Sequence, residues 1–84
     1  MDESSGEKLE AVRRRLGIDL RDLYLTYFGL GGTATPVETD AYLRGAATLD
    51  RLQHDTLAQA INEHAVDAGG NHPAPYGEDL AERP

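Results

Sequence analysis

The sequence predicts an all-α fold, a small four-helix domain with a flexible C-terminal tail. Apolar residues recur at helical spacing in four successive stretches, and N-cap residues and glycines separate these stretches. No stretch shows the alternation of apolar and polar residues that is typical of a β-strand. The expected division is a flexible N-terminus over 1–6, a helical domain over 7–68 and a disordered Gly/Pro-rich tail over 69–84.

The first helix is expected over about 7–16. Leu9, Val12 and Leu16 lie at helical spacing there and form a thin apolar stripe. Gly17 follows directly, and a glycine just past the last turn is a typical helix end.

The second helix is expected to begin after Asp19, its N-cap, with Asp22 as the acid of a capping box. Ile18 and Leu23 are placed to form a hydrophobic staple across this start. Apolar side chains surround most of the helix, and glycines end it. The apolar residues are Leu20, Leu23, Tyr24, Leu25, Tyr27, Phe28 and Leu30, and the glycines are Gly29, Gly31 and Gly32.

The third helix has the clearest start signal. Thr35 is the expected N-cap, Pro36 occupies the first helical position and Glu38 the third. The helix is expected to continue to about Ala46, with Gly45 weakening its end.

The fourth and longest helix is expected from about Thr48 to Ala68, where Gly69 and Gly70 stop it. One of its faces is apolar, formed by Leu57, Ala58, Ile61, Ala65 and Ala68. We expect the other helices to pack against it.

The composition excludes several classes of protein. Cysteine is absent, so neither a disulfide nor a thiolate zinc site can hold the fold together. Fifteen acidic residues against eight basic ones give a formal charge of −7, which repels phosphate backbones and anionic lipids. No apolar run is long enough to span a membrane, and the polar, acidic N-terminus is unlike a secretory signal. A cytoplasmic protein without a membrane role is therefore expected.

No catalytic, cofactor-binding or metal-binding residue is predicted, and the chain is interpreted as a non-enzyme. An acyl carrier protein needs a serine at the start of its second helix, whereas the only serines here are Ser4 and Ser5. His54 lies on the apolar face of the fourth helix, where a hydrogen-bonded core histidine is the usual case. His64 points about a quarter turn away from it, and His72 lies in the tail, so no metal-ligand spacing arises.

Two functions remain open. The leading hypothesis is a small helical regulator or adaptor that acts through contact with another protein or as a homodimer, because interface cores favour tyrosine and phenylalanine. The alternative reading of the same helix is that it is simply the central helix of the domain. The residues assigned to the partner interface are Tyr24, Leu25, Tyr27, Phe28 and Leu30.

The second function is nucleic-acid binding through a basic cluster, with the second and third helices as a helix-turn-helix. The run from Tyr42 to Ala58 is also similar to the ANTAR RNA-binding module. Against this, Glu38 and Asp40 would lie at the end of the helix that should meet the bases, and the net charge is negative. The basic cluster is Arg13, Arg14, Arg15 and Arg21.

The runs 16–24 and 27–32, together with 53–55 and 60–63, resemble short uncharacterised actinobacterial all-helical proteins of regulatory type. The low lysine content, with Lys8 the sole lysine, fits a GC-rich source of that kind. The resemblance implies a regulatory role and no particular binding or catalytic residue.

Overall fold

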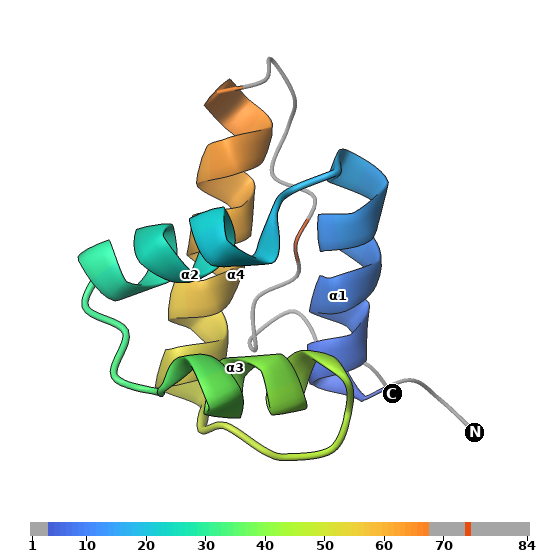
Figure 1. The fold of residues 1–84 in the computed structure, drawn as a ribbon, viewed down its shortest axis with the longest axis vertical. Helices are drawn as coiled ribbons and strands as arrows, with labels where there is room; N and C mark the ends of the chain where they lie inside the picture. Colours follow the sequence, from blue (N-terminus) through green and yellow to red (C-terminus); the bar gives the residue numbers. More distant parts are fainter. Residues whose placement is uncertain (1–3, 68–73, 75–84) are drawn as a thin grey trace.

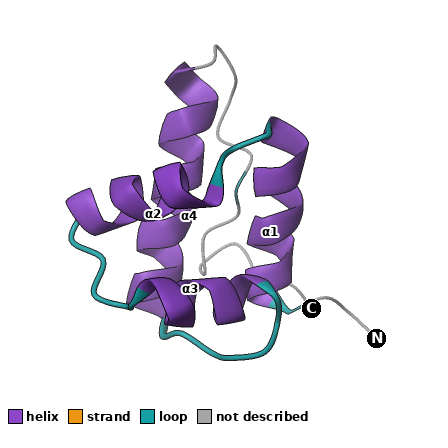
Figure 2. Cartoon of the chain, viewed as in Figure 1, coloured by secondary structure: helices purple, strands orange, loops and turns teal. Residues whose placement is uncertain are grey.

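The structure, a computed structural model, describes residues 4–67 and Ala74 (Figure 1). Every element within that part of the chain is a helix or a loop, as Figure 2 shows, so the predicted all-α four-helix fold is confirmed. None of the helices described is both long and apolar enough to cross a membrane. The helices are α1 (Ser5–Leu16), α2 (Leu20–Gly29), α3 (Pro36–Leu43) and α4 (Arg51–Asp67).

Helix α4 organises the domain. Helices α1 and α2 both pack against α4, and α3 packs against α1 (Figure 1). The apolar faces meet in one core, in which large apolar side chains from all four helices are almost completely excluded from water. These side chains are Leu9, Leu23, Tyr27, Leu43, Leu57 and Ile61.

Helix α1 begins earlier than predicted, because Ser4 caps it. The Ser4 hydroxyl oxygen accepts a hydrogen bond from the Glu7 backbone N–H (3.1 Å), and Glu7 Oε1 accepts one from the Ser4 backbone N–H (3.0 Å). This reciprocal pair satisfies two donors that would otherwise lack partners at the helix start. The prediction of a flexible N-terminus over 1–6 is therefore wrong for residues 4–6, and residues 1–3 lie outside the described part.

Side chains also accept hydrogen bonds from backbone N–H groups at the starts of α2, α3 and α4. The predicted capping box of Thr35 and Glu38 is present. Asp19 caps α2 by accepting from the Arg21 backbone N–H (2.8 Å), but within the described chain Asp22 makes no return bond, so this start is a simple cap. Helix α4 starts later than the predicted Thr48, because the Asp50 carboxylate accepts from the Gln53 backbone N–H (2.9 Å).

Helices α1, α2 and α3 end in the same way. A glycine takes the left-handed conformation just past each last turn, at Gly17 (φ +70°), Gly31 (φ +98°) and Gly45 (φ +78°). The next residue then donates its backbone N–H to a carbonyl five residues back, as Ala46 does to Ala41 (2.8 Å). This is why α3 ends at Leu43 and does not reach the predicted Ala46.

Ala74 is the one residue of the predicted tail over 69–84 that the structure describes. It is 3% exposed and belongs to the hydrophobic core. The Asn62 side chain holds its backbone by two bonds, one from Ala74 N to Oδ1 (2.8 Å) and one from Nδ2 to Ala74 O (3.2 Å). The rest of 69–84 lies outside the described residues.

Candidate functional site

The residues predicted to form a partner interface divide between the core and the surface. Tyr27 is fully buried, so its ring is not available to a partner, and assigning it to the interface was wrong. Leu30 is half-buried and packs against the core. Tyr24 is half-buried, whereas Leu25 and Phe28 are 55% and 62% exposed. The exposed part of the prediction is therefore the outer face of α2.

The Tyr27 hydroxyl fixes the loop that joins α2 to α3. It accepts a hydrogen bond from the Ala34 backbone N–H (2.9 Å) and donates one to Gln53 Oε1 on α4. The same Gln53 oxygen also accepts from the Thr33 backbone N–H (2.9 Å). Because the loop is bonded to both α2 and α4, the position of α3 relative to α2 is fixed.

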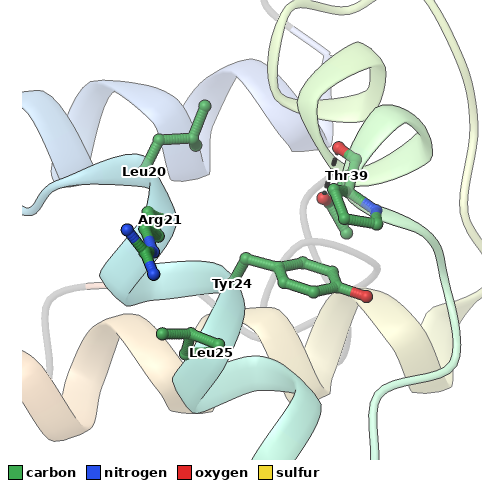
Figure 3. A pocket seen from close by; sticks show the side chains of 6 residues that line it. Leu20, Arg21, Tyr24, Leu25 and Thr39 are labelled. Atoms are coloured by element: carbon green, nitrogen blue, oxygen red, sulfur yellow. Dashed lines mark hydrogen bonds between the residues drawn. The ribbon is translucent and has the colours of Figure 1, made fainter.

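A groove of about 420 Å³ lies between α2 and α3 (Figure 3). The Tyr24 ring extends across it toward the loop, where its hydroxyl donates to the Ala34 carbonyl (3.2 Å). The Thr39 hydroxyl donates to backbone carbonyls of its own helix, such as that of Pro36 (2.9 Å), so the groove wall is mainly apolar. The groove is lined by Leu20, Arg21, Tyr24, Leu25, Pro36 and Thr39.

Aromatic rings connect this groove with the core. The Tyr27 and Tyr24 ring centroids are 5.8 Å apart, and the Tyr24 and Phe28 rings stack with centroids 6.3 Å apart. Such pairs stabilise one another beyond simple burial. The exposed Phe28 ring therefore stacks on Tyr24, which in turn contacts the buried Tyr27. Val37 of α3 is a further exposed apolar residue, at 78% exposure.

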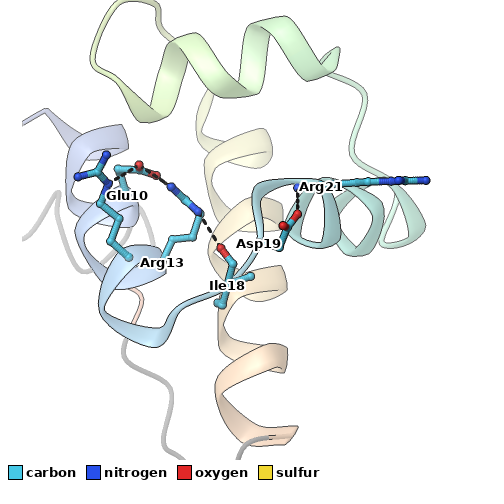
Figure 4. A network of polar contacts seen from close by, with 6 residues as sticks. Glu10, Arg13, Ile18, Asp19 and Arg21 are labelled. Atoms are coloured by element: carbon cyan, nitrogen blue, oxygen red, sulfur yellow. Dashed lines mark hydrogen bonds and ion pairs between the residues drawn. The ribbon is translucent and has the colours of Figure 1, made fainter.

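Arg21 is the one charged residue in the groove lining, and within the described chain its guanidinium makes no ion pair. In Figure 4 its side chain lies on α2, apart from the Glu10–Arg13 pair. In this it differs from Arg13 and Arg14 of α1.

The carboxylate of Glu10 binds two arginines of α1 (Figure 4). Arg13 makes a two-pronged pair with it (both 2.7 Å) and also donates to the Ile18 carbonyl (2.7 Å), while Arg14 approaches at 3.1 Å. The Arg13 donors hold the pKa of Glu10 below its ordinary value, against the effect of partial burial. Glu10 reciprocally raises the pKa of Arg13. Two of the four arginines considered for nucleic-acid binding are therefore already paired.

The described histidines serve as hydrogen-bonding residues between helices. His54 is buried, as its position on the apolar face predicted, and its Nδ1 lies 2.6 Å from the Tyr42 hydroxyl of α3. Burial raises the pKa of the Tyr42 hydroxyl. His64 Nε2 lies 3.0 Å from the Thr26 hydroxyl on α2. Across residues 4–67 and Ala74, no three His, Asp or Glu side chains are grouped in a way that could hold a metal ion.

Sequence reasoning missed the α3 side of the groove. Pro36 is already explained by its place at the start of the third helix, and nothing in the sequence marks Thr39 as lining a surface groove. Leu20 and Arg21 could have been found, because they lie four residues and three residues before Tyr24 on one helical face. Comparisons with protein-family models, with curated proteins and with solved structures found no match.

Proposed function

We propose that this protein is a non-enzymatic regulator or adaptor of the cytoplasm that binds another protein chain in the groove between α2 and α3. One observation supports this proposal above the others. Leu25 and Phe28, large apolar side chains, stay exposed beside an apolar groove, on the same helix that buries Leu23 and Tyr27. Contiguous apolar surface of this kind marks interaction sites in soluble domains.

The rigidity of the groove supports the same role. Its α2 wall rests on Tyr27, and its α3 wall is held through the loop bonded to Tyr27 and Gln53. A preformed groove binds with little loss of conformational entropy, because its side chains are already ordered. A helix or extended segment that fills it would bury the exposed rim residues.

The chemistry of the lining favours binding over catalysis. Four of the six lining residues are apolar or aromatic, and the Thr39 hydroxyl is engaged by its own helix. Arg21 supplies a fixed positive charge, which suits orientation of a partner and not proton transfer near neutral pH.

The proposal can be tested by site-specific photo-crosslinking in the native host. A photoreactive residue is placed at Leu25 in the groove or, as a matched control, at Leu52, an equally aliphatic and 70% exposed position on α4. We expect discrete protein adducts from position 25 and none from position 52. If neither position gives an adduct, or if both give the same ones, the groove is not a specific docking site.

A further inference from the structure

The outer face of α2 carries a short stripe of four residues that is suited to pairing with itself. Arg21, Tyr24, Leu25 and Phe28 occupy positions i, i+3, i+4 and i+7, so they form one continuous helical face. None of them is fully buried, and the stripe contains no carboxylate, in a chain with fifteen acidic residues. We call these four residues the α2 stripe.

We propose that the occupant of this surface is a second copy of the chain, whose α2 stripe packs antiparallel against the first about a two-fold axis. The inference rests on the proposed function and specifies its partner. If the axis passes between Tyr24 and Leu25, Tyr24 of each copy lies opposite Leu25 of the other. In the same register, Arg21 of each copy lies opposite Phe28 of the other.

In this register the Arg21 guanidinium and the Phe28 ring, at the two ends of the stripe, each gain a contact partner. The Arg21 guanidinium makes no ion pair with the described residues of its own chain, and the Phe28 ring is 62% exposed. A guanidinium over an aromatic ring is a favourable cation–π contact. Because a two-fold interface is self-complementary, the contact forms twice in each dimer.

The size and charge of the surface determine how strong this dimer is. Helix α2 has 10 residues and is about 15 Å long, so the interface is smaller than that of an obligate dimer. Two copies that each carry a charge of −7 also repel one another. We therefore expect a reversible dimer that strengthens as salt is added, whereas binding to a basic partner would weaken with salt.

The test is sedimentation equilibrium of the full chain over a range of concentrations, at about 20 mM and about 500 mM NaCl, between which screening shortens from about 20 Å to about 4 Å. We expect a monomer–dimer equilibrium whose dissociation constant falls at the higher salt. A strict monomer at both salt concentrations overturns the inference. In that case, crosslinks from position 25 to a different protein would leave the proposed function standing.

A charge exchange tests the register. Phe28→Arg would place two arginines face to face at both ends, and Arg21→Glu would place a carboxylate over the ring, so each should raise the dissociation constant at least about tenfold. The double variant Arg21→Glu/Phe28→Arg pairs opposite charges in this register and should return within about threefold of wild type at low salt. Failure of the double variant to recover overturns the proposed register.

Leu52→Arg on α4 is the matched control for these substitutions. It introduces the same side chain at an exposed apolar position on a different helix, and it should leave the dissociation constant unchanged. If Leu52→Arg weakens the dimer as much as Phe28→Arg does, α2 is not the interface. Circular dichroism of each variant checks that the helices are retained.

Discussion

At the residue scale, Gly6 permits a close approach between α1 and α3. A Cβ atom added to Gly6 of α1 would lie 2.0 Å from the Tyr42 carbonyl oxygen of α3, far inside van der Waals contact. Both contacting groups are backbone, so neither can rotate away. The spacing between α1 and α3 therefore depends on the absence of one side chain.

We predict that Gly6→Ala destabilises the fold by about 1–3 kcal/mol or more, because the helices must separate to admit the methyl group. The matched control is Gly29→Ala in α2, where an added Cβ meets nothing within 4 Å. That change should be neutral or stabilising by up to about 1 kcal/mol, since alanine favours a helix. Urea denaturation of both variants measures the difference, and equal effects would contradict the steric account.

Glu10 makes the stability depend on pH. In the folded state the Arg13 donors hold its pKa below the ordinary value of 4.5. The unfolded chain therefore takes up a proton at higher pH than the folded chain does. The stabilisation is fully present above pH 4.5 and is lost as the pH falls through the lowered folded pKa.

We therefore expect the free energy of unfolding of Glu10→Gln to change less with pH at acidic pH than that of wild type. Arg13→Gln, which keeps the carboxylate but removes its main donor, should flatten the same region. The free energy of unfolding, measured from neutral pH to below 4.5, provides the comparison. Variant profiles that run parallel to wild type would show that this ion pair is not responsible.

At the element scale, Asn62 connects α4 with a segment beyond the four helices. Its amide pairs with both the N–H and the C=O of Ala74, in the way one β-strand pairs with another. Both residues are almost completely buried. Buried backbone groups need such partners, because water cannot replace them.

Replacing Asn62 with leucine should lower the free energy of unfolding by about 1–3 kcal/mol, since the Ala74 backbone would stay buried without these two bonds. Gln59→Leu makes a similar change at an exposed position of the same helix and should alter the stability by less than about 0.5 kcal/mol. Hydrogen exchange at the Ala74 amide is the direct measurement. Protection of that amide in Asn62→Leu equal to wild type would refute the role of the pair.

The elements differ in how well the sequence predicts them, and the reason is local. Thr35 and Gly17 act on neighbouring backbone groups, so their effects can be predicted from a few adjacent residues. Ala74 was mispredicted because a Gly/Pro-rich composition says nothing of a distant Asn62 side chain that can bind the backbone. Ser4 was mispredicted because its position near the chain end outweighed its match to a capping box with Glu7.

The exposed face of α2 was predicted in part, for a related reason. Composition identified α2 as unusually apolar and aromatic, and Leu25 and Phe28 are indeed exposed. Periodicity alone did not separate Tyr27 from them, because a helix that is apolar on most sides has no unique inner face. Only the bonds of the Tyr27 hydroxyl to Ala34 and Gln53 show which side faces the core.

At the scale of the whole molecule, much of the acidic charge has a structural use. Carboxylates cap or complete the starts of all four helices, and others pair with arginines along α1, α3 and α4. The abundance of acidic residues therefore reflects helix capping and ion pairing as well as net charge. The capping residues are Glu7, Asp19, Glu38 and Asp50, and the pairing residues are Glu10, Asp40 and Asp55.

The stack of rings from Tyr27 through Tyr24 to Phe28 also gives the protein a built-in optical reporter. The chain has no tryptophan, so its ultraviolet emission comes from its four tyrosines. Tyr27 and Tyr42 are buried and hydrogen-bonded, whereas Tyr24 lines the groove. A chain that docks there changes the surroundings of the Tyr24 ring directly, so unlabelled protein can report its own association through tyrosine fluorescence.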